Sequence, residues 1–430
     1  MRTGLRALTA IQLVVLGCTS TMPTTPTPLA PTSPPSVSPS PSASPAPPAP
    51  DNTATPSPTA AATAAPTATP IAQSWRWRRI GLIGSQLLTD PPTAVGFEGG
   101  YVVAGAEGTG AVWTSVDGAN WESTTLPVPG DRLRGPRRGA AFIEISDAAA
   151  NGATVLLVGQ ICRYEVDQDQ VESFCAPIAH VSSSAGAWMT AEPFEGLETD
   201  EGSRAVAAWA VADGWEAQVC GARQGVWFSS DGIDWSERPD GSPFGCAWPA
   251  LNATFTRLIA NNAAFGELAA LKSSPDGVTW SDVDAPFAGR VGALRVGPIT
   301  ESRIEGDENW LVVLQLDAPN DPATPTPASE MWTSTDLVQW RQAELPRSDV
   351  SQAIATTIGF VLDAQDGCQT AGPENEPCPK PMQAQFWSPD GVTWTAIAPH
   401  LSGPVVIVDG PAGVLLIGVI SGRVWRLDGD

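Results

Sequence analysis

Residues 385–394 read QFWSPDGVTW, and the last seven of these residues form the pattern S-x-D-G-x-x-W. Further copies stand at residues 115–121 (SVDGANW), 229–235 (SSDGIDW), 274–280 (SPDGVTW) and 334–340 (STDLVQW). The last of these copies carries Leu337 where the others carry glycine. One short pattern that recurs along a chain indicates a repeat architecture.

Each copy, here called a box, predicts a strand, a tight turn and a second strand. Apolar runs such as Val226 to Phe228 precede the boxes, and Asp-Gly between two such runs is a strong hairpin signal. Glycine adopts positive φ without steric cost, the Asp carboxylate accepts bonds from turn amides, and Trp supplies area to bury. We therefore interpret the boxes as structural turns and not as ligand sites. Their defining residues are Ser115, Asp117, Trp121, Ser229, Asp231, Trp235, Ser274, Asp276, Trp280, Ser334, Asp336, Trp340, Ser388, Asp390 and Trp394.

Two more apolar segments precede each box, for example residues 93–97 and 101–105, so the unit has four strands, like a propeller blade. Trp188 ends a degenerate copy of the box at residues 182–188, which lacks the Asp. The C-terminal residues supply three strands, and residues 75–80 are expected to add the fourth. The predicted fold is all-β, a seven-bladed β-propeller of four-stranded antiparallel blades, closed by joining its N- and C-terminal strands.

The box resembles the Asp-box, or BNR, repeat of the sialidase-like propellers, whose usual form, S-x-D-x-G-x-T-W, is one residue longer. The resemblance covers residues 74–430 and implies the propeller fold. It says little about activity, because Asp-box propellers include sialidases, sorting-receptor domains and photosystem assembly factors.

The N-terminal residues predict a membrane anchor and a stalk. Residues 1–17 have the basic start and short apolar run of a signal peptide. They end in a Val-Leu-Gly-Cys sequence that resembles the lipobox of bacterial lipoproteins, which implies that Cys18 is lipidated. Leu16 departs from the usual small residue, and an ordinary cleaved signal peptide is the alternative. Residues 18–73, rich in Pro, Thr, Ser and Ala, predict a disordered linker with a reach on the order of 150 Å. The expected location is the bacterial cell envelope, facing the extracytoplasmic side.

The remaining six cysteines predict disulfides. Six cysteines allow fifteen connectivities, and loop-closure cost favours local pairs. An even number outside the lipobox fits an oxidising compartment. A zinc site is the alternative, but the chain has no C-x-x-C and only two histidines, so we predict no metal or other cofactor. The expected pairs are Cys162 with Cys175, Cys220 with Cys246, and Cys368 with Cys378.

The formal net charge of −23 argues against nucleic acid as a partner and against docking on anionic lipid. Solubility is the simpler explanation for this charge.

The end of each blade opposite the box is the expected ligand face. Long insertions are predicted there at residues 162–175, 317–330 and 366–382, and insertions gathered on one face often mark the binding face of a repeat array. Unselected variation in surface loops is the alternative. The loop arginines expected at this face are Arg132, Arg134, Arg137, Arg138, Arg290 and Arg347.

The resemblance to sialidases implies three carboxylate-binding arginines, a Tyr–Glu nucleophile pair and an acid Asp. The Arg-Ile-Pro signature is absent, and the only tyrosines are Tyr101, in a predicted strand, and Tyr164. Without a late Tyr, the covalent step has no evident nucleophile. We predict a monomeric, lipid-anchored, non-catalytic scaffold that binds a protein or glycan. The alternatives are a divergent exo-α-sialidase-like glycoside hydrolase and a purely structural envelope protein.

Overall fold

The computed structural model describes residues 75–83, 92–105, 110–129, 141–167, 170–183, 186–191, 203–221, 223–238, 270–287, 330–347, 349–365, 383–398 and 403–429, with shorter pieces at 194, 197, 246, 250–251, 257–260, 300–304, 307–314 and 401. Cys18 and the linker at residues 18–73 lie outside these ranges.

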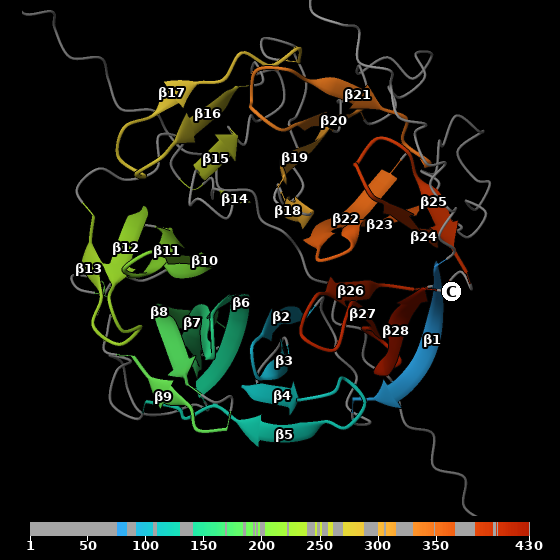
Figure 1. Ribbon diagram of the computed structural model, residues 1–430. Coiled ribbons are helices and arrows are strands. Elements are labelled where there is room, and N and C mark those ends of the chain that lie inside the picture. Colours follow the sequence, from blue (N-terminus) through green and yellow to red (C-terminus); the bar gives the residue numbers. More distant parts are fainter. Residues whose placement is uncertain are drawn as a thin grey trace, which may run out of the picture. The chain divides into compact units, whose positions relative to one another are not determined.

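The described residues contain strands and no helix, and the strands form seven four-stranded antiparallel sheets (Figure 1). Six of the sheets use four consecutive strands. They are β2 (Thr93–Phe97), β3 (Gly100–Ala104), β4 (Ala111–Ser115) and β5 (Glu122–Thr125); β6 (Ala141–Asn151), β7 (Thr154–Asp167), β8 (Gln170–Ser182) and β9 (Met189–Thr190); β10 (Arg204–Val211), β11 (Gly214–Cys220), β12 (Gly225–Ser229) and β13 (Ser236–Glu237); β14 (Ala250–Leu251), β15 (Arg257–Ala260), β16 (Leu271–Ser274) and β17 (Ser281–Asp282); β18 (Thr300–Ile304), β19 (Asp307–Leu314), β20 (Glu330–Ser334) and β21 (Arg341–Ala343); and β22 (Asp349–Thr356), β23 (Gly359–Gln365), β24 (Gln383–Ser388) and β25 (Thr395–Ile397).

The seventh sheet joins the two termini of the folded region. Strands β26 (Val405–Val408), β27 (Leu415–Gly418) and β28 (Arg423–Gly429) are completed by β1 (Trp75–Leu82), which pairs antiparallel with β28. The expected contribution of the N-terminal strand to the last sheet is therefore confirmed. Seven sheets of this form are consistent with the blades of a β-propeller.

In every box the serine hydroxyl and the aspartate carboxylate bond different amides. In the first box, the Ser115 hydroxyl accepts from Gly118 N at 2.8 Å, and this bond is buried. Asp117 Oδ1 accepts from the amides of Ala119 and Asn120 at 2.9 Å each, and these bonds are exposed. The amide N–H of Asn120, followed by that of Ala119, lowers the pKa of Asp117 to about 2. The other four boxes repeat both sets of bonds.

The fourth box position shows why glycine is usual there. Gly118 has a φ of 74°, and a Cβ on it would lie 2.6 Å from Leu415 Cδ1 in the neighbouring sheet. Leu337 occupies the same position in the fifth box with a φ of 60°, in the left-handed region. The chain therefore tolerates a strained leucine at one of its five boxes.

Neighbouring sheets are linked by their first strands and by buried side chains. Contacts join β2 with β6, β6 with β10, β14 with β18, β18 with β22, β22 with β26, and β26 with β2. The Tyr101 hydroxyl donates to Gly413 O at 2.6 Å, and Gln352 accepts from Ile407 N at 3.0 Å. Asp147 accepts from Ala208 N at 2.9 Å, and burial raises the pKa of this carboxyl to about 6. Hydrophobic side chains fill the spaces between the sheets.

We expect the box serine to stabilise the fold more than the box aspartate. Ser229 is 2% exposed, and Ser229→Ala leaves the buried amide of Gly232 without its acceptor, which should lower the unfolding free energy by roughly 1–3 kcal/mol. Asp231→Ala should cost less, because water replaces the carboxylate at the exposed amides of Ile233 and Asp234. Denaturant unfolding at pH 7 measures both changes.

Exposed Ser236→Ala is the matched control and should stay within about 0.5 kcal/mol of the unmodified chain. Because hydrogen bonds lower the folded-state pKa of Asp231, its contribution is present above pH ~4 and is lost on further acidification. A larger loss for Asp231→Ala than for Ser229→Ala would contradict this division of roles.

The strained backbone of Leu337 predicts that glycine at this position does not lower the unfolding free energy, whereas loss of glycine at the same position of the first box does. Leu337→Gly relieves a left-handed backbone that costs an L-residue about 1–2 kcal/mol, which offsets the lost contact of a half-buried side chain. We expect its unfolding free energy to be unchanged or to rise by up to about 1 kcal/mol. Gly118→Ala should lower the unfolding free energy by roughly 1–3 kcal/mol through positive φ and overlap with Leu415. Thermal melts of the two variants check the opposite signs.

Candidate functional site

Each sheet has two chemically different ends. In the strand order of the sheets, the turn between the first and second strands and the box turn lie at one end, which we call the box end. The turn between the second and third strands lies at the other end, which we call the insertion end. Box ends of neighbouring sheets lie together, since Glu98 N donates to Gly152 O at 3.0 Å and Thr357 N to Asp409 Oδ2 at 2.6 Å. The insertion ends of these sheets therefore face the same way.

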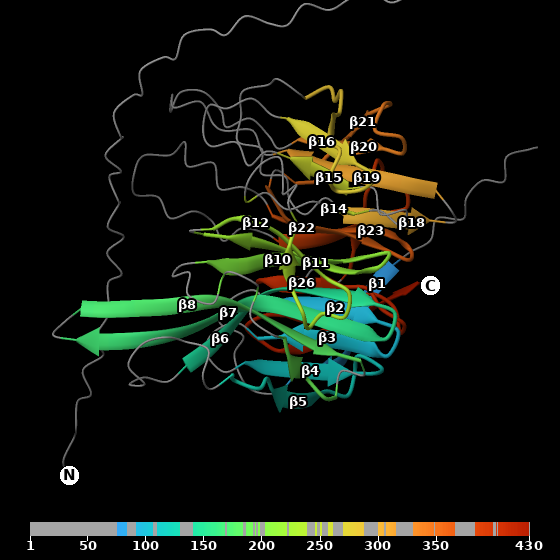
Figure 2. The same cartoon turned by 90° about the vertical axis from the view of Figure 1, so that its left-hand side faces the viewer.

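The most prominent feature of the insertion end is the hairpin of β7 and β8. Its register continues from Val155 opposite Ser182 to Asp167 opposite Gln170. Strand β6, the first strand of this sheet, pairs with β7 only as far as Arg163, so the last four pairs between β7 and β8 extend beyond β6. Figure 2 shows β7 and β8 continuing past β6. We call residues Tyr164 to Ser173 the hairpin tip.

The structure corrects the expectation of a loop at residues 162–175. These residues form a regular antiparallel hairpin, and the disulfide between Cys162 and Cys175 joins two directly opposite residues. The physical reason is in the sequence: Tyr164, Val166 and Val171 favour strands, and the register places Val166 opposite Val171. This disulfide, here called the Cys162–Cys175 staple, therefore lies at the base of the hairpin tip.

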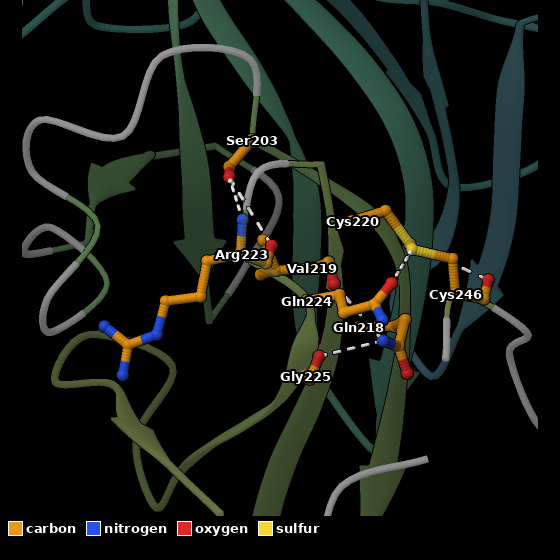
Figure 3. The surroundings of a disulfide bond; sticks show 8 residues. All are labelled: Ser203, Gln218, Val219, Cys220, Arg223, Gln224, Gly225 and Cys246. Carbon is orange, nitrogen blue, oxygen red and sulfur yellow. Dashed lines mark hydrogen bonds between the residues drawn. A yellow bond between two sulfur atoms is a disulfide. The ribbon is translucent and has the colours of Figure 1, made fainter. Parts of the chain in front are cut away.

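A second predicted disulfide, Cys220 with Cys246, is present at the end of β11 (Figure 3). Around it, Ser203 Oγ accepts from Arg223 N at 3.3 Å, and Gln218 donates to Gly225 O at 2.9 Å. Both bridges thus stand at the insertion end, and both predicted pairings are confirmed. The predicted bridge between Cys368 and Cys378 lies outside the described residues, in the connection between β23 and β24.

A buried carboxylate in the third sheet is already engaged. Glu216 is 2% exposed, accepts from Trp209 Nε1 at 2.7 Å, and pairs with Arg238 at 3.0 Å. The Arg238 guanidinium also lies 4.7 Å from the Phe228 ring centre. Arg223 pairs with Glu237 nearby. These contacts hold strands β10 to β13 together, and both carboxylate oxygens of Glu216 have a donor, so the group is suited to structure and not to acid–base work.

Of the six arginines expected at the ligand face, the structure describes one. Arg347 is half-buried and lies between β21 and β22, on the connection that leaves the insertion end of one sheet for the next. Arg132, Arg134, Arg137, Arg138 and Arg290 lie outside the described residues, as do residues 317–329 of the insertion predicted at 317–330. A clamp of several arginines at this face remains a prediction.

Tyr101 has the packing role expected from its place in a strand. Its side chain is fully buried, its hydroxyl is bonded to Gly413 O, and burial raises its pKa to about 12. A phenol in this state is neither accessible nor ionisable near neutral pH, so Tyr101 is not a candidate nucleophile.

Two further kinds of feature are absent from the described part of the chain. No three His, Cys, Asp or Glu residues there come together in a way that would hold a metal ion. Nor do the described residues, which form no helix, provide a helix that is long and apolar enough to cross a bilayer.

One cluster of arginine residues was not predicted from the sequence, because residues 75–80 were interpreted only as a strand. Strand β1 reads WRWRRIGL and pairs with β28 at the outer side of the seventh sheet. This pair of strands, here called the β1–β28 ribbon, is rich in arginine and has one carboxylate, Asp428. The alternation of Trp and Arg at residues 75–79 was the available signal, but its meaning depends on pairing with residues almost 350 positions away.

Known proteins resemble this chain only distantly. No protein-family profile and no curated protein matches it. Among solved structures, it is similar to the Trypanosoma rangeli sialidase in complex with the inhibitor DANA, at 14% identity and a TM-score of 0.41 over 68% of this chain and 53% of that one. It also resembles a family 117 glycoside hydrolase from the marine bacterium Zobellia galactanivorans, at 13% identity and a TM-score of 0.33 over 58% of this chain and 86% of that one.

A glycosyl hydrolase from Bacteroides ovatus is similar at 12% identity and a TM-score of 0.31, over 70% of this chain and 92% of that one. The chain spans about half the length of the Trypanosoma rangeli sialidases. The structures that it resembles are thus sialidases and glycoside hydrolases, but the scores are low, and the fold assignment rests on the seven sheets themselves.

Proposed function

We propose that this chain is a lipid-anchored, extracytoplasmic, seven-bladed β-propeller that acts as a non-catalytic binding or assembly scaffold for a protein or glycan. The observation that carries the proposal is the β7–β8 hairpin, whose tip extends past β6 at the insertion end above the Cys162–Cys175 staple. The five boxes serve the fold at the other end. The Asp-box assignment and the monomeric state belong to the same proposal.

A closed ring is the arrangement that best fits the contacts between sheets. The pairing of β1 with β28 and the contact of β26 with β2 join the two chain ends, and most first strands contact the next in sequence. Contact between the sheets of β10 and β14 would complete the ring. Closure would leave the sheets no open inner edge and would place all insertion ends on one face.

The hairpin suits partner binding because it is ordered in advance. A disulfide at the base of the tip restricts the free chain, so less conformational entropy is lost when the tip engages a partner. The tip sequence, Tyr164 to Ser173, has four acidic residues and no basic one. Such a composition favours a polar, hydrated contact with a protein or glycan.

The second candidate is a divergent sialidase-like glycoside hydrolase that uses Glu and Asp with arginines of the ligand face. The weak similarity to sialidases motivates it. Against it stand the burial of Tyr101 and the engagement of Glu216. An acidic pair beside the arginines at 132–138 would favour this second candidate.

The hairpin tip provides the test. Replacing Tyr164 to Ser173 by Asn-Gly keeps the disulfide and every pair between β6 and β7, and joins Arg163 to Phe174, which already face each other. We expect the melting temperature to stay within a few degrees and the capture of a specific partner from an envelope extract to be lost. Quantitative mass spectrometry of captured proteins and glycans measures the loss.

The control is a substitution at the box end, Val338→Ser, which alters an exposed residue and should leave capture unchanged. The same samples should not hydrolyse a fluorogenic sialoside. Turnover that disappears in Arg137→Ala or Arg290→Ala would overturn the scaffold proposal in favour of the glycoside hydrolase.

The lipid anchor has its own test. In Cys18→Ala the proposed acylation site is absent, so we expect the protein to leave the membrane fraction and to appear in the soluble fraction outside the cytoplasm. Cell fractionation with metabolic labelling by a fatty-acid analogue measures both changes. Retention of the label in Cys18→Ala would contradict the assignment of Cys18.

A further inference from the structure

The β1–β28 ribbon carries a charge opposite in sign to that of the whole protein. Its two strands hold five of the 23 arginine and lysine residues in a chain of net charge −23. They contain one carboxylate, Asp428. The five residues, here called the arginine ribbon, are Arg76, Arg78, Arg79, Arg423 and Arg426.

The register of β1 with β28 brings two of these positive charges together, which destabilises the sheet. Arg78 lies directly opposite Arg426, and like charges in that position destabilise a sheet. Asp428 accepts from both guanidinium groups, from Arg78 and from Arg426 at 3.0 Å. One carboxylate thus serves two guanidinium groups, and a positive charge remains at the surface.

The remaining charge gathers at one corner beside exposed apolar side chains. Arg79 and Arg423 are exposed, and neither forms an ion pair with any residue that the structure describes. Leu82 is 49% exposed and lies opposite Arg423, and Ile420 is 62% exposed in the turn that precedes β28. Ile83 N donates to Gly422 O at 2.7 Å, which holds this turn against the end of β1.

We infer that this corner, made by Arg79, Arg423, Leu82 and Ile420, docks on an anionic lipid surface. Guanidinium groups bind lipid phosphates in a bidentate manner, and exposed Leu and Ile side chains enter the interfacial region of a bilayer. Each basic residue near an anionic leaflet adds to the attraction.

Charge complementarity favours an anionic lipid surface as the partner of this corner, although the protein as a whole is acidic. At physiological salt, charges act over a Debye length of about 8 Å, so a surface responds to the nearest groups and not to the total charge. The expectation from net charge, that anionic lipid is disfavoured, therefore holds for most of the surface but not for this corner.

The alternative to lipid binding is a purely structural role, in which these arginines protect the outer strand of the sheet. Strand β1 is the outer strand of its sheet, and charged residues on an outer strand prevent pairing with another molecule. That role needs positive charge along β1. It does not need two exposed aliphatic side chains next to Arg423, which is on the inner strand of the ribbon. The combination of cations and aliphatic side chains favours lipid.

The test uses the full-length chain carrying Cys18→Ala, so that no acyl chain contributes and failure of the anchor proposal leaves this experiment intact. Binding is measured by flotation with vesicles of 30 mol% phosphatidylglycerol in phosphatidylcholine, and with phosphatidylcholine alone. We expect binding to the anionic vesicles only, weakened by 0.5 M salt. Arg79→Glu with Arg423→Glu should lower the vesicle partition coefficient at least about tenfold.

Matched variants distinguish vesicle binding by this corner from general effects of changed charge or stability. Arg341→Glu changes an exposed arginine on the outer strand β21 of another sheet and should bind as the parent chain does. Leu82→Ser with Ile420→Ser should weaken binding without changing its salt dependence, and thermal melts confirm folding. No binding of the parent chain to anionic vesicles, or an equal loss in Arg341→Glu, would overturn the inference and leave the arginines as protection of the sheet edge.

Discussion

The hydrogen bond from the fourth residue's amide to the serine hydroxyl of each box, buried in three boxes and part-buried in two, is the contact on which the sheets depend. It fixes a turn so tight that the glycine backbone lies against the next sheet, as Gly118 lies against Leu415 and Gly232 against Val181. The aspartate orders the outer, solvated half of the same turn. Because the turn is at once the end of a hairpin and a packing surface, it couples folding within a sheet to stacking between sheets.

Stacking in turn places the side chains that link sheets far from the boxes. Tyr101 reaches Gly413 in the sheet that holds both termini, and Gln352 bonds the backbone of β26. These bonds join residues more than 50 positions apart, so they form only when the sheets are already in order. The long insertion-end hairpin can extend past β6 because its base, and not its tip, carries the pairing with β6.

The sequence predicted the elements that depend on local chemistry. Box turns, four strands per unit, the partnership of residues 75–80 with the C-terminus and two disulfides all follow from spacing and turn residues. The prediction of a loop at 162–175 was wrong because pairing of Val166 with Val171 depends on register, which composition does not give. The arginine ribbon was missed because its charges come together only through the register of β1 with β28, which the sequence pattern does not give.

The two proposals place their residues at the same end of the sheets. Strand β1 is the fourth strand of its sheet, so Leu82 stands at the insertion end, as does the turn that contains Ile420. A corner that rests on lipid would turn the insertion end toward the bilayer, and the hairpin tip would then meet molecules at the membrane surface. The acidic tip and the basic corner would select opposite charges there: anionic lipid at the corner, and a partner with exposed positive or neutral polar groups at the tip.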